Sequence, residues 1–486
     1  MKNIIAALLL LMPMVVGAQL KGSYFLENSV NRHRMNPAFA PRANYLQLPG
    51  MGNLNAGVVS NLDVPTFLYP VDGNLGTFLH PSVSVKRFER SLANRPYADA
   101  ETSANILNFG FFTKNKAFWT FDISMNAGLD VDIPADAFLF LKKGAGTHGE
   151  SYNVANINAY ATGSVSAALG YSRDIFDGLR VGAKVRVIAP VGYAAINMEN
   201  MRISTSKEKW TIQTEGYAHV VAQGVDVNFS EGDLFPEVEF DMDRFLNSKI
   251  KAGMGGSIDI GAEYKLDIGS HFDGLLLSAS ITDLGCIFYN KEILRSFSTK
   301  GEIEWVGFQD VSVDNQDIED AINDLKDSAS GLLNFKEADG PSSFVRSTMP
   351  RIYAGAELPF LRNSMSVGLL YSGRFSHSYS RHELTASYNL TPAKWFALGL
   401  NYSFLNTART MGAILELTPK AGINLCIGCD YIPLSFAPAP VLGEVFNLPE
   451  SLSLLPMSMR LNLHFGLSLA IGGDRYKIRE LLIGSR

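Results

Sequence analysis

The 486-residue sequence has no apolar run of 18 or more residues after residue 18, and a membrane-spanning helix needs about that length. Helical membrane spans are therefore excluded beyond that point. The G-x-S-x-G, P-loop and H-E-x-x-H patterns of common enzyme classes are also absent. No Pro/Ser-rich linker, low-complexity tract or fixed-period repeat divides the chain. One large unit is therefore the simplest organisation.

Cysteine is scarce, and the three cysteines are Cys286, Cys426 and Cys429. The C-x-x-C at 426–429 is a spacing that redox and metal sites use. It lies in an alternating segment, 423–431, where a separation of three places the two thiols on opposite faces of a strand. Because no second C-x-x-C or suitable histidine pair accompanies it, we interpret both as small apolar residues. We expect no metal and no cofactor.

The net charge of −6 says little about partners, and no basic stripe with interleaved aromatics points to nucleic acid.

The main feature of the sequence is the alternation of apolar residues with polar or small ones. From Met459 to Ile471 every second residue is apolar and the others are polar or small, so one face of a strand would be wholly apolar. Thirteen residues at about 3.3 Å each span roughly 40 Å, and a tilt of about 45° leaves about 28 Å of height. Similar alternation occurs at 119–126, 164–171, 179–187, 257–266, 365–372, 384–390 and 396–404.

A large soluble β-sandwich also has alternating strands. Strands longer than ten residues, with charges on the minority face, are more typical of a membrane barrel with a polar lumen. We predict an all-β fold, a transmembrane antiparallel β-barrel of about 14 strands, with 16 as the alternative, within residues 61–472. The polar residues predicted to face the lumen include Asp259, Glu263, Arg460, Asn462 and His464.

Residues 1–18 have the features of a signal peptide. Lys2 supplies the positive charge, residues 4–16 are an apolar stretch too short to span a bilayer, and Val16-Gly17-Ala18 are small enough for cleavage after Ala18. A retained N-terminal anchor is the alternative. Export without helical spans predicts the outer membrane of a diderm bacterium.

Residues 19–60 are predicted to form an N-terminal hatch or plug, with a disordered tail as the alternative. The first thirty of them lack long alternation and are rich in Asn, Arg and Pro, and Asn36-Pro37 favours a turn. The basic residues just before this turn are expected to face lumenal carboxylates: Arg32, His33 and Arg34 against Asp259 and Glu263.

Two connections stand out between the strands. Residues 310–339 are acidic and carry Ile318, Ile322 and Leu325 at helical spacing, which predicts a short amphipathic helix in an extracellular loop. A solvated loop is the simpler interpretation, and a docking site for a partner or for divalent cations is the alternative, although the spacing is not that of an EF-hand. The Pro-rich connection 433–456 is expected to cap a barrel mouth or contact another protein. Residues 473–486 form a short C-terminal tail.

Several segments resemble a family of Bacteroidota outer-membrane barrels of unknown function. This family is similar to the larger group that contains FadL-type fatty-acid transporters and the PorV and PorP/SprF proteins of type IX secretion. The matching segments are Met35-Asn36-Pro37-Ala38-Phe39-Ala40, residues 118–123, 132–136 and 140–141, and the pair 256–264 and 277–285. The resemblance implies about 14 strands and a hatch carrying the Asn36, Pro37, Ala38 motif. It supplies neither a reaction nor a substrate.

Two functions follow as hypotheses. The first is FadL-like passage of small hydrophobic molecules, which in such proteins implies a hatch-controlled route that sometimes opens sideways into the bilayer. The second is a structural or secretion-accessory barrel, as in PorV and PorP, that docks a surface or secreted protein. A barrel hydrolase is a remote third, because His464 is the histidine that falls cleanly on a lumen face and its neighbours suggest a solvated residue. We expect that the protein is not an enzyme and that its constant partner is outer-membrane lipid.

Overall fold

The structure is a computed structural model. It describes residues 21–71, 74–144, 149–206, 210–223, 225–228, 237–240, 252–268, 274–305, 335–377, 379–405, 409–418, 422–434, 436–438 and 454–471. The predicted signal peptide and the C-terminal tail lie outside these residues, as does almost all of the acidic loop and most of the Pro-rich connection.

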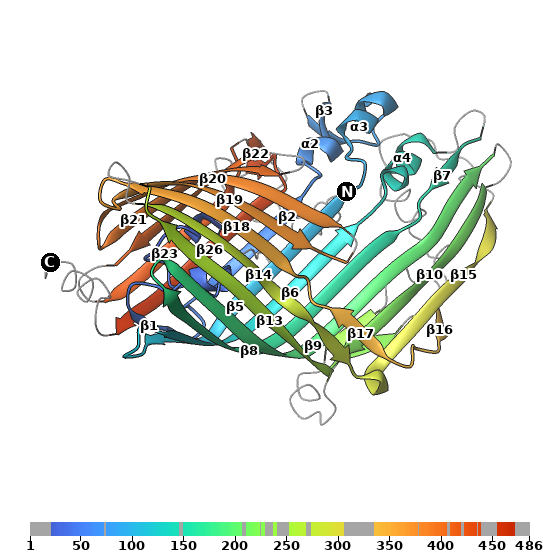
Figure 1. Cartoon of the computed structure of the whole chain (residues 1–486). Helices are drawn as coiled ribbons and strands as arrows, with labels where there is room; N and C mark the ends of the chain where they lie inside the picture. Colours follow the sequence, from blue (N-terminus) through green and yellow to red (C-terminus); the bar gives the residue numbers. More distant parts are fainter. Residues whose placement is uncertain are drawn as a thin grey trace, which may run out of the picture.

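The described chain forms a closed antiparallel β-barrel of 14 strands (Figure 1). The predicted fold class and the lower of the two predicted strand counts are therefore confirmed. Thirteen wall positions are single strands: β5 (Tyr97–Phe112), β6 (Phe118–Asp132), β8 (Ile157–Phe176), β9 (Leu179–Thr205), β13 (Gly253–Leu266), β14 (Leu275–Tyr289), β18 (Arg351–Phe360), β19 (Met365–Phe375), β20 (Ser380–Ala393), β21 (Phe396–Leu405), β22 (Arg409–Leu417), β23 (Ile423–Ile432) and β26 (Arg460–Ile471).

The remaining wall position is shared by two short strands, β1 (Asn44–Gln47) and β2 (Leu54–Ser60). Both pair with β26 on one side and with β5 on the other, so together they close the barrel. Residues 48–53 interrupt this position, and six residues there stand opposite Gly466 and Leu467 of β26. The expected end of the hatch at residue 60 is therefore wrong, because residues 44–47 and 54–60 are paired into the wall.

The two faces of each wall strand differ as the alternation predicts. On β21 the side chain of Leu400 is 47% exposed on the outer face, whereas its neighbour Asn401 is 5% exposed inside. The same division holds around the barrel, because exposed aliphatic and aromatic residues alternate with buried polar ones. This apolar exterior is what a strand wall facing lipid requires. Of the helices in the described ranges, none has the length and apolarity to cross a bilayer.

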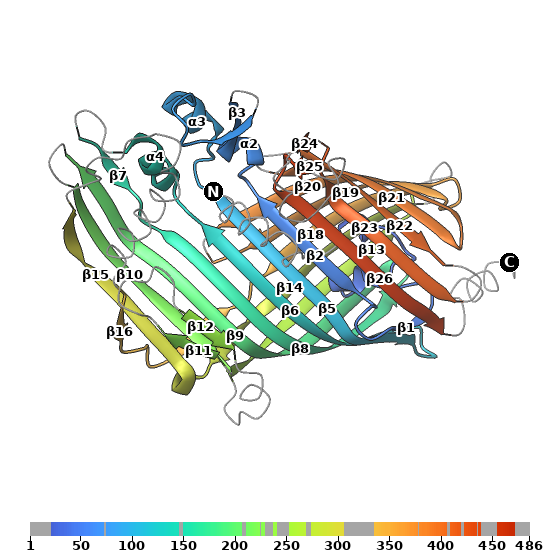
Figure 2. The same cartoon turned by 180° about the vertical axis from the view of Figure 1, so that it is seen from behind.

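The two ends of the barrel differ in their connections (Figures 1 and 2). At one end neighbouring strands are joined by short turns, such as Asp177–Gly178 and residues 361–364. At the other end the connections are long and contain α2 (Val64–Phe67), a hairpin of β3 (Leu68–Val71) and β4 (Asn74–Thr77), α3 (Val85–Ser91), α4 (Ala135–Lys143) and β7 (Ser151–Asn153). Since outer-membrane barrels have short periplasmic turns and longer extracellular loops, this second end is the outer one.

A sheet extension projects beyond the barrel at the outer end (Figure 2). The first part of β9 pairs with β13 in the wall, whereas Gly192–Thr205 pairs with β10 (Trp210–Ala222). Strand β10 also pairs with β15 (Leu294–Trp305), which follows the turn η3 (Lys291–Ile293) and pairs with β16 (Lys336–Ala338). β17 (Phe344–Ser347) prolongs the wall beside β14, and two further hairpins are β11 (Val225–Asn228) with β12 (Glu237–Phe240) and β24 (Phe436–Pro438) with β25 (Leu454–Pro456).

Candidate functional site in the barrel lumen

Residues 21–41 lie inside the barrel, and most of their side chains are buried. We call residues 21–41 the lumenal segment. It contains two single turns, η1 (Lys21–Ser23) and η2 (Arg32–Arg34). Its aromatic residues pack on the wall: Tyr24, Phe25 and Phe39 form one buried cluster with Tyr353 and Leu370.

The start of the lumenal segment is fixed by two buried carboxylates on the wall. The backbone N–H groups of Lys21 and Gly22 donate to the two carboxylate oxygens of Asp430 at 2.7 and 2.8 Å. The Lys21 ammonium forms an ion pair with Glu383 and donates to the Tyr431 hydroxyl at 2.7 Å. Because a buried charge is costly unless it is paired, these contacts hold the segment to β20 and β23.

The predicted motif Asn36, Pro37, Ala38 packs against the opposite part of the wall. The Asn36 side-chain amide donates to the carbonyl of Ala262 at 3.1 Å, and its oxygen accepts from the Ala38 N–H at 3.0 Å. Two glycines permit this approach, since a Cβ on Gly182 would overlap the Pro37 carbonyl and one on Gly261 would overlap the Asn36 side chain. The small residues on the inner faces of β9 and β13 therefore make the surface on which this turn rests.

Substitution of Gly182 by alanine should loosen the lumenal segment. The new methyl group would overlap backbone atoms of Pro37 and Ala38, and overpacking of this kind typically costs about 1–3 kcal/mol. We expect faster proteolysis within residues 21–43, measured by limited digestion and mass spectrometry. Gly163→Ala on β8 is the matched control, because the nearest atom to its added carbon is 4.0 Å away. Equal digestion of both variants would contradict this packing.

The basic turn before this motif, η2, contacts several uncharged side chains of the wall and of the lumenal segment. His33 Nε2 lies 2.8 Å from the Tyr45 hydroxyl, and Arg34 donates to Asn105 Oδ1 at 2.5 Å. The Arg32 guanidinium lies over the Phe39 ring, 4.0 Å from its centroid. None of these contacts is with Asp259, whose carboxylate is neutralised by a residue of the wall.

That wall residue is Arg186, whose guanidinium lies 3.2 Å from Asp259 and also pairs with Asp283. Asp283 in turn lies 3.8 Å from Arg351 on β18. Arginine suits such a position because its planar fork can contact two carboxylates at once. The result is a chain of charges on the inner faces of β9, β13, β14 and β18.

This chain of charges continues across the lumen. Arg374 near the end of β19 forms an ion pair with Asp99 of β5, and it lies 2.6 Å from Glu101 of the same strand. Arg351 also contacts Glu101 at 2.6 Å, and Arg381 contacts Asp99 at 2.9 Å. We call this group, together with Asp130 at 3.4 Å from Arg374, the charge bridge.

The charge bridge joins opposite sides of the barrel. Following the strand pairings, six strand positions separate β5 from β19 in either direction around the wall. Direct ion pairs between them therefore mean that inward side chains meet in the middle of the lumen. Asp99 and Arg374 are 2% and 6% exposed. Within the described residues, the lumen is bridged by charge toward its outer end, and the lumenal segment occupies space beside this bridge.

The polar residues predicted to face the lumen do not form one site. Asp259 belongs to the β9–β14 charges, and Glu263, on the same strand, is half-buried. Asn462 Oδ1 accepts from the N–H groups of Asp430 and Tyr431 at 2.5 and 3.1 Å. Arg460 pairs with Asp63 at 2.9 Å, near the outer mouth. His464 is buried against Asn55 and Asn31, which makes it a packed residue instead of the solvated one expected.

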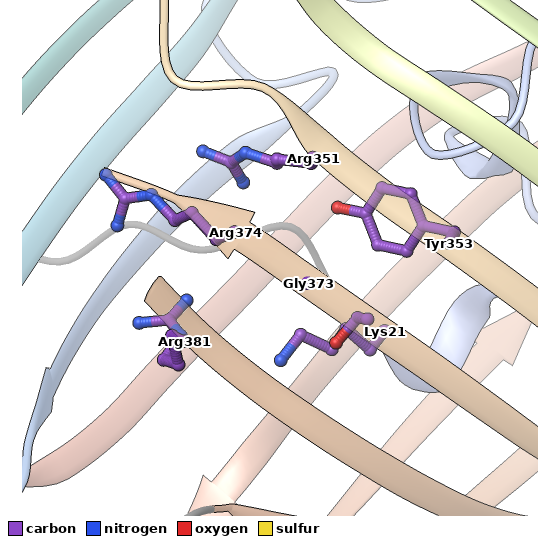
Figure 3. Close-up of a pocket in the computed structure, with 7 residues that line it drawn as sticks. Lys21, Arg351, Tyr353, Gly373, Arg374 and Arg381 are labelled. Atoms are coloured by element: carbon purple, nitrogen blue, oxygen red, sulfur yellow. The ribbon is translucent and has the colours of Figure 1, made fainter. Parts of the chain in front are cut away.

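A small cavity lies beside the charge bridge (Figure 3). It is lined by Lys21, Arg351, Tyr353, Ser372, Gly373, Arg374 and Arg381. Figure 3 shows the four basic side chains arranged around this space, three from the wall and one from the lumenal segment. None of these residues is among the site residues predicted from the sequence. The one sequence feature that could have indicated them is a charge on the polar face of an alternating strand.

The three cysteines form no disulfide bond with one another. Cys286, Cys426 and Cys429 are free thiols, and Cys426 is buried whereas Cys429 is partly exposed. In the part of the chain that the structure describes, no three His, Cys, Asp or Glu side chains are grouped so that they would hold a metal ion.

Comparisons with known proteins place the chain in a family. Residues 37–430 match a family of unknown function (DUF5723), and no curated protein matches. Several solved structures are similar in fold. One is the toluene transporter TodX of P. putida, which is 12% identical to this chain and has a TM-score of 0.38; the match covers 91% of this chain and 94% of that one. Another is a Pseudomonas aeruginosa FadL homologue, with 10% identity, 92% and 95% coverage and a TM-score of 0.38. A third is the translocator domain of the autotransporter NalP from Neisseria meningitidis, with 6% identity, 89% and 90% coverage and a TM-score of 0.34.

Structural similarity at this level carries no functional argument. The family match, by contrast, covers well over half of the chain. It confirms the predicted membership in a family of unknown function, whereas the Bacteroidota origin and the likeness to PorV and PorP stay predictions. The chain belongs to the DUF5723 family, and its fold is a transmembrane antiparallel β-barrel.

Proposed function

We propose that this chain is an accessory outer-membrane barrel that docks another protein at the outer surface. The observation that carries the proposal is the closed lumen. An open route for substrates would need a continuous space along the barrel axis. In the described residues this axis is crossed by buried ion pairs between β5 and β19 and filled by the lumenal segment.

The lumen also has the wrong chemistry for an apolar substrate. Sites for small apolar molecules are usually lined mainly by hydrophobic and aromatic side chains. The cavity beside the charge bridge is lined by four cations and has a volume of about 20 Å³. The buried wall residues around the lumenal segment are largely Asn, Ser, Thr, Asp and Arg. A closed polar lumen fits a scaffold better than a passage.

The sheet extension supplies a surface for a partner. Strand β9 has 27 residues, which at about 3.3 Å each is roughly 90 Å, or about 60 Å of height at a tilt of 45°, against an apolar band of about 25 Å. The excess stands outside the membrane. A groove of about 510 Å³ lies on this extension, lined by polar residues of β7, β9, β10 and β15 that include Arg202, Gln213, Glu215, Lys300 and Glu302.

The groove has charges of both signs at its surface. Lys300 Nζ lies 2.5 Å from Glu215, and the Gln213 amide donates to Glu302 at 3.2 Å. Exposed pairs of this kind contribute little to stability, and polar and charged complementarity gives a contact its specificity. We infer that the groove is where a surface or secreted protein binds.

Site-specific photo-crosslinking tests this proposal in native membranes. A photoreactive residue at Gln213, in the groove, should give an adduct with a distinct protein. The same residue at Arg362, in a turn at the opposite end of the barrel, is the matched control and should not give that adduct. Adducts of equal yield at both positions, or no protein adduct at Gln213, would overturn the proposal.

Passage of small hydrophobic molecules is the second candidate, and one observation favours it. The wall is interrupted at residues 48–53, between β1 and β2, and Met51 and Leu54 are exposed there. Residues 48–53 still hydrogen-bond to Leu467 of β26 and Asn105 of β5, but they do not form a regular strand there, and we infer that a sideways route would open at this position. Purification from native membranes in mild detergent, with mass spectrometry, separates the two candidates: a stoichiometric protein supports docking, whereas bound lipid or another apolar molecule without protein supports passage.

A further inference from the structure

We propose that the cavity beside the charge bridge binds a small monovalent anion of the size of chloride. This proposal is independent of the docking function, because it concerns the interior of the barrel and needs no partner protein. Four cationic side chains line the cavity, and no carboxylate is among the lining residues (Figure 3).

The cations are held close together by the fold. Arg351, Arg374 and Arg381 come from the outer ends of three neighbouring strands, β18, β19 and β20, and Lys21 comes from the lumenal segment. The positive charge of Arg381 acts unfavourably on both Lys21 and Arg374. The carboxylates that offset this repulsion, Asp99, Glu101 and Glu383, pair with these cations but do not line the cavity. An anion inside the cavity would relieve the repulsion directly.

The donors around the cavity favour an anion over a water molecule. Guanidinium and ammonium groups can only donate hydrogen bonds, so they satisfy an anion fully but leave the hydrogens of a water with few acceptors. The Nε atom of Arg374 is buried and has no hydrogen-bond partner among the described residues. The Nε atom of Arg351 also makes no hydrogen bond there, although it lies 3.8 Å from the Asp283 carboxylate. Ser372 and Tyr353 add hydroxyl groups to the lining. A donor-rich lining with unused N–H groups is the arrangement that binds anions.

The size of the cavity limits the ligand. The centre of a water-sized particle can move through about 20 Å³ there, so the cavity has room for at least one ordered water or one monatomic ion. A halide fits this space. The cavity is therefore assigned to chloride, with bromide as its heavier substitute.

Diffraction from crystals of the full chain soaked in bromide tests the assignment directly. The expected result is an anomalous peak in the cavity, within contact distance of the guanidinium groups. Ordinary water density at that position, without an anomalous peak in bromide, would overturn the proposal. The measurement needs no variant and so does not depend on the folding of one.

A stability measurement tests the same site in solution. At constant ionic strength, replacing gluconate with chloride should raise the unfolding temperature by roughly 1–3 °C, since a ligand that binds only the folded state stabilises it. Arg381→Gln should lose this chloride-dependent shift and Arg381→Lys should keep it, because the lysine retains the charge. If Arg381→Gln keeps the shift, the chloride acts elsewhere and the assignment is wrong. If the glutamine variant does not fold, loss of the shift in Arg381→Lys would also overturn it.

Discussion

Replacing Arg374 with methionine should destabilise the folded barrel by about 3–5 kcal/mol, the cost of removing one partner from a buried ion pair. The guanidinium contacts Asp99, Glu101 and Asp130, and methionine would leave three carboxylates with less positive charge in a dry part of the lumen. Reversible urea unfolding in detergent or lipid vesicles measures the change. Part of the loss should be recovered when Asp99→Asn is added, because the neutral amide does not need the cation.

The matched control for this substitution is Lys300→Met on the sheet extension. Lys300 and Glu215 form an ion pair with side chains 77% and 39% exposed, so water can replace each partner and no measurable change in unfolding free energy is expected. An equally small effect for Arg374→Met would mean that the charge bridge is solvated and that the lumen is wet at this level.

Replacing Leu400 with arginine should cost about 2–4 kcal/mol, because its side chain lies at the middle of β21 on the outer face, where the bilayer is driest. The leucine is 47% exposed there, and exposure on this wall means contact with lipid. Urea unfolding in vesicles measures the change in unfolding free energy.

The control is Trp395→Arg, in the turn between β20 and β21. The Trp395 side chain is 56% exposed, but it lies at the membrane interface, where an arginine costs about 0–1 kcal/mol. Equal costs at both positions would argue against lipid around β21.

Alternation alone would have suggested Asn401→Arg as a mild control, since an inward side chain avoids lipid. The structure shows why it is unsuitable. Asn401 donates to Asp430 at 2.9 Å, and its side chain lies where a Cβ on Gly22 or Gly412 would touch it. An arginine there would displace the lumenal segment. The sequence predicts which face of a strand points inward, but it does not predict how full the interior is.

The wall itself follows from local pattern. Alternation at 396–404, 365–372 and 384–390 predicts β21, β19 and β20, because one apolar face per strand is a property of neighbouring residues. The lumen does not follow in this way. Arg374 and Asp99 are 275 residues apart, and nothing local to either residue indicates that the other stands opposite. Their role depends on the number of strands and on the registers between them.

The first wall position shows the same limit. β1 and β2 are short, and the six residues between them break the alternation, so the sequence around 44–60 resembles a plug more than a wall. The pairing of these strands with β26 and β5 is determined by closure, which is a long-range property. The Asn36, Pro37, Ala38 motif follows from the resemblance. The glycines that receive it, Gly182 and Gly261, are only small residues within alternating segments when the sequence is considered alone.

The seam between β26 and the β1–β2 position has a consequence for biogenesis. The last strand that the structure describes must be present before this seam can form, since β26 supplies one of its two sides. The residues that fill the lumen come directly before β1, and they are anchored by wall groups as far apart as Asp430 and Ala262. The interior must therefore be packed before, or as, the final hydrogen bonds of the wall are made. A chain that ended before β26 would lack both a neighbour for its first strands and an enclosure for what precedes them.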